Sequence, residues 1–268
     1  NAIPGVDTIT FTGSVFTDNT PDTITLTTGE LRITDSLTIQ GLGANRLTVS
    51  GNNASRVFNI DNGNASQINV AIDGLTIAGG NTTGLGGGIL NRENLTVSRS
   101  TLRNNVAGEG GGINNDGGTL TVTQSTFNNN RAVTFSGGID NDRGTATITN
   151  STISGNRAAN FGGIATNLGN TTIANSTVTN NQGNGNGNGL FNGGTGSITT
   201  VRNTIVAGNQ NNRDVAGNFT SSGNNLIGNS AGGSGFTKGD KVGSATNPLN
   251  PLLSPLQDFG GTTQTHAL

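Results

Sequence analysis

The stretch that decides the fold runs from residue 111 to residue 156 and contains two near-copies of one pattern. Residues 111–130 read GGINNDGGTLTVTQSTFNNN, and residues 137–156 read GGIDNDRGTATITNSTISGN. In each copy a Gly-Gly-Ile triplet precedes a segment in which Thr alternates with an apolar residue, and this alternation is typical of a β-strand. The chain therefore repeats a unit of short strands and turns.

The same pattern extends in both directions and produces three apolar columns, whose successive members are 24 to 27 residues apart. A coil of about 25 residues cannot bury its own apolar side, so it must stack on its neighbours. Successive coils run in the same direction, which makes the sheets parallel and favours right-handed connections. The columns are Ile89, Ile113, Ile139, Ile164 and Leu190; Ile77, Leu102, Phe127, Ile153, Val178 and Ile205; and Val97, Val122, Ile148, Ile173 and Ile198.

These columns predict an all-β fold, a right-handed parallel β-helix (solenoid) with about 25 residues and three short strands per coil. No proline occurs from residue 22 to residue 247, so nothing there removes a ladder hydrogen bond. We expect one domain, with the β-helix at 1–229, irregular to about residue 74 and regular over 75–229. Residues 230–268 are expected to form a C-terminal side coil or cap of the same domain.

Composition excludes several classes of function. The 268 residues include 45 Gly and one His but no Cys, Trp or Tyr, so thiol chemistry and the usual aromatic platforms for sugars and bases are missing. A net charge of -2, with scattered charges, does not suit a nucleic-acid partner. No apolar run is long enough for a transmembrane segment. The chain begins with Asn, and we expect it to be a mature or excised piece.

Asn recurs in two sets at fixed positions of the repeat. Identical Asn side chains at the spacing of parallel strands can hydrogen-bond along the axis and tolerate the left-handed bend of a corner. We also expect the Gly pairs before the repeated Ile to be corners with unusual backbone dihedrals. We interpret the Asn sets as structural ladders, the first made of Asn105, Asn130, Asn156 and Asn181, and the second of Asn91, Asn115 and Asn141.

Asp116, Asp140 and Asp142 form the best cluster of carboxylates. Asp116 and Asp142 follow equivalent Ile residues by three positions, so we expect them on adjacent coils about 4.8 Å apart. Arg92 has the same position one coil earlier and Arg143 follows Asp142, which favours a solvated row of ion pairs. The alternative is a surface ligand row or the active site of a polysaccharide lyase or hydrolase.

The oxygen atoms of Asp61, Asn62 and Asn64 are spaced as a calcium ion requires, although an ordinary Asn-Gly turn explains the same residues. No other cofactor is expected. Two Thr columns raise a further alternative, because regular Thr arrays can order water as an ice-binding surface does. Thr is also a common residue of exposed strands. The columns are Thr96, Thr121, Thr147, Thr172 and Ser197, and Thr101, Thr126, Thr152, Thr177 and Thr204.

Several segments resemble known bacterial families. Three segments resemble the GGI and FxxN-type repeats of polymorphic outer-membrane proteins and other parallel β-helix repeat proteins. They are Gly86-Gly87-Gly88-Ile89, residues 125–130 and residues 151–156. Residues 203–209, 222–228 and 255–268 are similar to the choice-of-anchor Q domain family, and residues 1–11 are similar to the segment directly after the CSLREA-type motif in large bacterial surface proteins. This resemblance implies a secreted or surface-displayed protein and supplies no catalytic residues. The family pattern would continue beyond both ends.

We therefore expect a non-catalytic structural or adhesive module of an extracellular or cell-surface bacterial protein. Its partners are expected to be copies of itself or other domains of a larger surface protein. Without an N-terminal cap, its end coils would permit end-to-end assembly into rods or filaments. The alternatives are a β-helix that binds or degrades polysaccharide, with carbohydrate as the partner, and an ice-binding β-helix.

Overall fold

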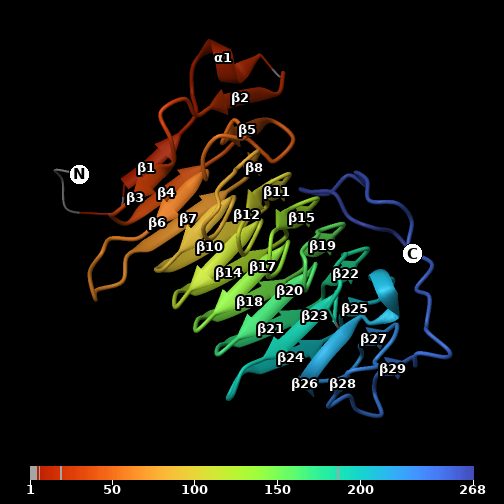
Figure 1. Ribbon diagram of the computed structural model, residues 1–268. Helices are drawn as coiled ribbons and strands as arrows, with labels where there is room; N and C mark the ends of the chain where they lie inside the picture. Colours follow the sequence, from red (N-terminus) through yellow and green to blue (C-terminus); the bar gives the residue numbers. More distant parts are fainter. Residues whose placement is uncertain (1–4, 6, 19, 186) are drawn as a thin grey trace.

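The computed structural model describes residues 5, 7–18, 20–185 and 187–268, and these form the expected parallel β-helix (Figure 1). The first residues of the expected domain, and part of the opening 1–11 stretch, lie outside the described residues. Each regular coil passes through three sheets in turn, which we call sheets C, A and B. All pairings between named strands are parallel, as a stack of coils requires (Figure 1).

Sheets A and C join through one long strand, β26, which pairs with both. Sheet A contains β1 (Asp7–Thr10), β4 (Leu37–Gln40), β7 (Asn69–Asp73), β10 (Asn94–Ser98), β14 (Thr119–Thr123), β18 (Thr145–Thr149), β21 (Asn170–Ala174), β24 (Ile198–Arg202) and β26 (Val215–Ser221). Sheet C contains β3 (Leu31–Ile33), β6 (Phe58–Ile60), β9 (Ile89–Asn91), β13 (Ile113–Asp116), β17 (Ile139–Asp142), β20 (Ile164–Asn167) and β23 (Leu190–Gly193).

Sheet B forms the third side of the solenoid. It contains β2 (Asp22–Thr25), β5 (Leu47–Ser50), β8 (Thr76–Ala78), β11 (Thr101–Arg103), β15 (Thr126–Asn128), β19 (Thr152–Ser154), β22 (Thr177–Thr179), β25 (Ile205–Val206), β27 (Leu226–Ile227) and β29 (Lys241–Val242). The remaining elements are α1 (Ser14–Thr17), the 3-10 turn η1 (Gln210–Asn212), β12 (Val106–Ala107), β16 (Arg131–Ala132) and β28 (Gly233–Ser234).

The core consists of the apolar columns, stacked coil on coil. Ile113 pairs with Ile139, Val122 with Ile148, and Phe127 with Ile153 in register. None of these side chains is exposed to solvent, and Ile164 is 1% exposed. Removing each from water stabilises the fold by roughly 1.5 to 3 kcal/mol. The outward position of Thr121 beside buried Val122 confirms the expected strand register.

The expected register is wrong in the last regular coil. Val201, not Ile198, pairs with Ile173, and Ile198 is 52% exposed. The cause is the loop between β23 and β24, which puts Val201 11 residues after Leu190, two more than separate Ile173 from Ile164. The longer loop also changes the second column. Val206, and not the expected Ile205, pairs with Val178.

The Gly pairs are needed for close packing between coils and not for an unusual dihedral. Gly111 and Gly112 do not have positive φ, whereas a Cβ on either residue would lie 2.6 Å from a carbonyl oxygen of the next coil. The left-handed residues of the corner after sheet B are instead Asn104, Asn129 and Asn180, which immediately precede members of the first Asn ladder. Asn tolerates this conformation better than most residues.

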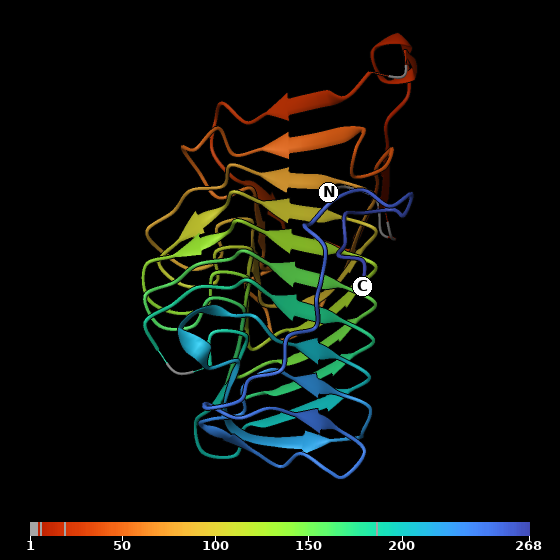
Figure 2. The ribbon, with the colours of Figure 1, turned by 90° about the vertical axis from the view of Figure 1, so that its right-hand side faces the viewer.

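The chain turns back after the last coil and runs beside the solenoid. Residues 254–267, which we call the C-terminal hairpin, are closed by two hydrogen bonds of 3.0 Å between the backbones of Gln257 and Thr265. The hairpin lies against the outer face of sheet B (Figure 2). The tail therefore covers a side of the solenoid.

Candidate functional site

The expected row of acids runs along the outer face of sheet C. Asp116 and Asp142 are register partners on β13 and β17. Arg92 Nε lies 3.0 Å from Asp116 Oδ2, and Arg143 Nη2 lies 2.9 Å from Asp142 Oδ2 and also contacts Asp116. Asp61 extends the row, because its Oδ2 lies 2.9 Å from Arg92 Nη1. Each carboxylate is thus matched by a guanidinium, as a row of ion pairs predicts.

Asp140 lies on the same outer face as Asp142 but is only 3% exposed. Burial, assisted by the negative charges of Glu109 and Asp142, raises the pKa of Asp140 to about 7. The side-chain amide of Asn114 donates a hydrogen bond of 3.1 Å to Asp140 Oδ2. A carboxyl group of this pKa could serve as a general acid, but its burial keeps substrate away in this conformation.

The calcium candidate forms a turn whose side-chain oxygens accept hydrogen bonds from its own backbone. Asp61 Oδ1 accepts a hydrogen bond from the Gly63 amide at 2.8 Å, and Asn62 Oδ1 accepts one from the Asn64 amide at 2.7 Å. The hydrogen bond from Arg92, followed by the one from Gly63, lowers the pKa of Asp61. In the part of the chain that the structure describes, no group of three or more His, Asp or Glu side chains is placed to hold a metal ion.

The first Asn ladder runs unbroken inside the solenoid. The side-chain amide of Asn130 donates to Asn156 Oδ1 at 2.9 Å and to the Leu102 carbonyl at 2.9 Å. Asn130 Oδ1 accepts from both the backbone and the side chain of Asn105, at 3.1 and 2.9 Å. All four hydrogen-bonding positions of the buried amide are therefore used. Asn156 and Asn181 repeat the arrangement toward Asn209.

A carboxylate that the repeat pattern did not single out ends this ladder. Asp214 Oδ1 accepts from the backbone and side chain of Asn209, and Asp214 Oδ2 accepts from the Asn229 amide at 2.7 Å. The last position needs acceptors only, so Asp fits where Asn fits elsewhere. Burial raises the pKa of Asp214. The irregular step from Asn181 to Asn209 was the available signal for a ladder end.

The second ladder lies at the corner between sheets C and A. Asn91 donates to Asn115 at 2.6 Å, Asn115 donates to Asn141 at 2.7 Å, and Asn141 donates to Thr171 Oγ1 at 3.0 Å. The facing backbone leaves no room for a side chain, because a Cβ on Gly118 would lie 2.5 Å from the Asn91 amide nitrogen. Both Asn sets are therefore used by the fold itself.

A row of Ser residues was also missed. The hydroxyl of each accepts a hydrogen bond of 3.2 Å from the backbone amide of the coil before it. Spacing of 25 to 26 residues, the same signal that revealed the apolar columns, could have identified this row. Its members are Ser100, Ser125, Ser151 and Ser176.

The two expected Thr columns have different environments. The first lies on the outer face of sheet A, where Thr200 and not Ser197 follows Thr172. The second is covered by the C-terminal hairpin: Thr126 Oγ1 donates to the Gln264 carbonyl, and the hydroxyls of Thr152 and Thr265 lie 3.0 Å apart. The prediction that Thr204 is the last member of this column is also wrong, because Ile205 pairs with Thr177.

The single histidine holds this cover in place. His266 is 8% exposed; its Nε2 lies 2.9 Å from Ser154 Oγ, and its Nδ1 lies 2.6 Å from the Ser254 carbonyl oxygen. Both ring nitrogens therefore have partners within the protein. This arrangement makes His266 a residue that fastens the hairpin to β19.

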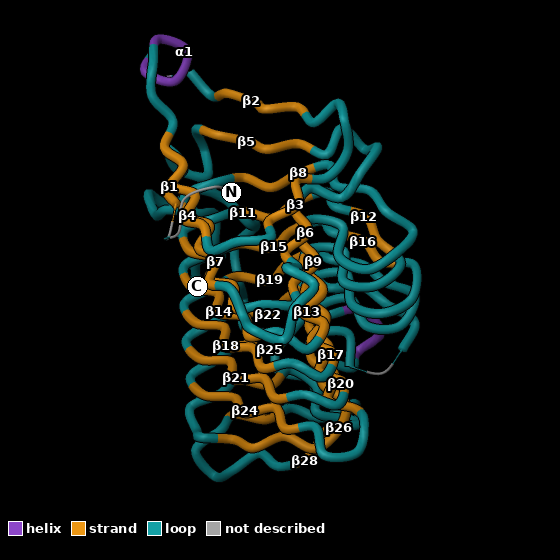
Figure 3. Tube along the Cα trace, turned by 90° about the vertical axis from the view of Figure 1, so that its left-hand side faces the viewer, coloured by secondary structure: helices purple, strands orange, loops and turns teal. Residues whose placement is uncertain are grey.

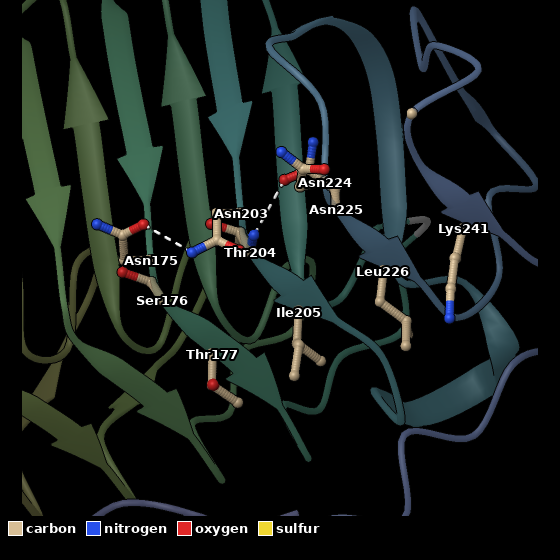
Figure 4. A pocket seen from close by; sticks show the side chains of 11 residues that line it. Asn175, Ser176, Thr177, Asn203, Thr204, Ile205, Asn224, Asn225, Leu226 and Lys241 are labelled. Atoms are coloured by element: carbon tan, nitrogen blue, oxygen red, sulfur yellow. Dashed lines mark hydrogen bonds between the residues drawn. The ribbon is translucent and has the colours of Figure 1, made fainter.

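Beyond the hairpin, sheet B carries an open hollow of about 440 Å³ (Figure 4). Asn175 and Asn203 line one side, joined by a hydrogen bond of 2.8 Å. Ile205, Leu226 and Lys241 line the other side on successive strands. Amides, aliphatic carbons and one ammonium group can bind a ligand, but the lining holds no pair of acid and base for a reaction.

Comparison with family models, with curated proteins and with solved structures finds no match for this chain. No helix among the described residues is long and apolar enough to cross a membrane. The fold and the local chemistry are therefore the basis for a functional proposal.

Proposed function

We propose that the chain is a non-catalytic structural or adhesive module of a secreted or cell-surface bacterial protein. The observation that supports this proposal most is the use of polar groups by the fold itself: the Asn ladders are saturated. On the outer face, Asp61, Asp116 and Asp142 are paired with arginine. Stacked coils with internal ladders make a rigid spacer whose outer faces remain available for contacts. The resemblance to choice-of-anchor Q and CSLREA-associated proteins agrees with a surface location.

An activity assay and a surface-labelling assay test this proposal. The purified chain should neither cleave nor eliminate across a panel of neutral and acidic polysaccharides. Activity that disappears in Asp116→Asn, Asp140→Asn or Asp142→Asn would identify an enzyme instead. Antibody against the purified chain should label intact cells that produce the protein, and label found only after lysis would contradict the surface location.

We further propose end-to-end assembly as the way such a module extends. Within the described residues, β1, β2 and β3 each pair with one strand, as do β28 and β29 at the opposite end. Strand edges of this kind can pair with another chain, and the C-terminal hairpin covers sheet B, not the last coil (Figure 2). Sedimentation should show mass rising with concentration, and microscopy should show rods. A strictly monomeric chain at high concentration would refute assembly.

One observation favours the ice-binding alternative as a second candidate. The corrected register places Thr at the same outward position of six successive strands of sheet A, so the array is longer than the sequence indicated. Thermal hysteresis of the purified chain, abolished by Thr121→Lys with Thr147→Lys, would establish this function. The residues are Thr96, Thr121, Thr147, Thr172, Thr200 and Thr220.

A further inference from the structure

The corner between sheets B and C carries charges that the fold does not use. Here Arg131 and Arg157 are register partners on adjacent coils, and Gln182 continues the same row. Because neighbouring strands are about 4.8 Å apart, the Cα atoms of these two positively charged residues have about the same separation. Both arginines are exposed, and no acidic partner is found for either within the described residues. This pair differs from Arg92 and Arg143, which have carboxylate partners.

The arginines line a hollow of about 220 Å³ that also includes Gln182, Asn184 and Gln210. These side chains offer hydrogen-bond donors, and no Asp or Glu is among the lining residues. Adjacent like charges repel one another, so an anion that lies between them would relieve the repulsion. A planar guanidinium suits a carboxylate well, because it can donate two parallel hydrogen bonds.

The same hollow has an apolar border. Val133 is 55% exposed and lines both this hollow and a neighbouring one of about 550 Å³, which contains Leu85 and Val106. Glu109 lies in the neighbouring hollow and hydrogen-bonds Thr134, so an acid borders the apolar side only. β12 and β16 form this projecting side of the coil (Figure 3). A fitting ligand therefore combines carboxylates with apolar carbon and extends along the axis.

We propose that this surface binds a linear acidic polysaccharide of the uronic-acid class. The carboxylates of successive sugars would pair with Arg131 and Arg157, and the carbon face of a ring would lie on Val133. Gln182 and Gln210 would donate to hydroxyl groups further along the chain. This inference rests on the proposed adhesive function and specifies its ligand.

Calorimetric titration with hexagalacturonic acid at low salt tests the assignment. We expect binding by the wild-type chain, weakened about tenfold to a hundredfold in Arg131→Gln/Arg157→Gln. Arg103→Gln/Arg202→Gln is the matched control, because it removes two positive charges from sheets B and A and should bind like the wild type. Arg131→Lys/Arg157→Lys keeps the charge without the planar fork and should weaken binding less than the Gln pair.

Two further ligands separate the sources of anionic chemistry. The methyl ester of the hexamer should bind far more weakly, and inorganic polyphosphate should not compete at equal charge. The inference fails if wild-type protein does not bind the hexamer, if the Gln pair binds normally, if the ester binds equally, or if polyphosphate is preferred. Rod formation by the wild-type chain is measured separately, so a wild-type chain that forms rods but does not bind the hexamer refutes only the ligand.

Discussion

Two polar rows run along the same coils, one inside the solenoid and one outside. In the inner row each Asn is buried and makes hydrogen bonds in both directions along the axis. In the outer row Asp116 and Asp142 alternate with arginines that are 41% and 59% exposed. The two rows have the same period but different surroundings. Regular spacing therefore identifies a row, whereas burial decides how much the row contributes to stability.

The largest expected effect is in the inner row. Asn130→Ala removes four side-chain hydrogen bonds, which are made with buried groups of Leu102, Asn105 and Asn156. Asn156 Oδ1 keeps the hydrogen bond from the backbone amide of residue 130. We expect the free energy of unfolding to fall by about 3 to 5 kcal/mol, because unpaired buried groups are costly. Urea denaturation followed by circular dichroism measures this. A loss below about 1 kcal/mol would make the inner row no more important than an exposed ion pair.

Asp140, the buried acid of the outer face, should affect the free energy of unfolding as strongly as a residue of the inner row. Asp140 has a pKa of about 7 in the fold and about 3.9 in an unfolded chain. The folded state therefore holds the proton more tightly, and stability should fall by about 2 to 4 kcal/mol as the pH rises from 4 to above 7. Asp140→Asn should remove this decline, and Asp142→Asn should retain it. An identical pH profile in wild type and Asp140→Asn would contradict the assignment.

The end of the inner ladder provides a smaller and more specific effect. Asp214→Asn introduces the residue that occupies all the remaining positions of this ladder. However, it places an amide group where only hydrogen-bond acceptors are needed. We expect a loss of about 1 to 2 kcal/mol at pH 7. The melting temperature measures this change, with Asp258→Asn as an exposed control. Stabilisation by Asp214→Asn would show that the ladder has no preferred end.

The smallest expected effect belongs to the outer row. Asp142→Asn removes one exposed ion pair with Arg143, so the unfolding free energy should change by less than about 1 kcal/mol. Raising the salt concentration should shrink the difference further, because exposed charges are screened. A change as large as that of Asn130→Ala would remove the distinction between the two rows.

Most of the fold could be predicted because apolar residues recur at nearly constant steps. The prediction failed where the loop between β23 and β24 adds two residues, since Gly-rich segments carry no apolar marker for their length. It also placed the Gly pairs correctly but for the wrong reason. A positive φ and a close approach of backbone both favour Gly at a position. The structure distinguishes the two causes, because the carbonyl oxygens of Gly137 and Gly138 lie too close to Gly111 and Gly112 for a side chain to fit.

The candidate surfaces were less predictable than the core. Spacing placed Asp116 beside Asp142, but it could not show that Asp140 is covered. It could not show that the hairpin covers Thr126 either, because that contact joins segments separated by 138 residues. The unpaired charge of Arg131 and Arg157 depends on which side chains reach them, which a repeat alone does not reveal.

The C-terminal hairpin gives the solenoid a long-range closure that coil stacking alone lacks. Contacts between neighbouring coils span one repeat, whereas His266 meets Ser154 across 112 residues of sequence. Such contacts require closure of a large loop and slow folding. We expect them to form after the intervening coils have stacked, with the hairpin as the last element to dock. Once docked, it must detach before β19 can separate from its neighbours, which makes it a kinetic latch against unwinding.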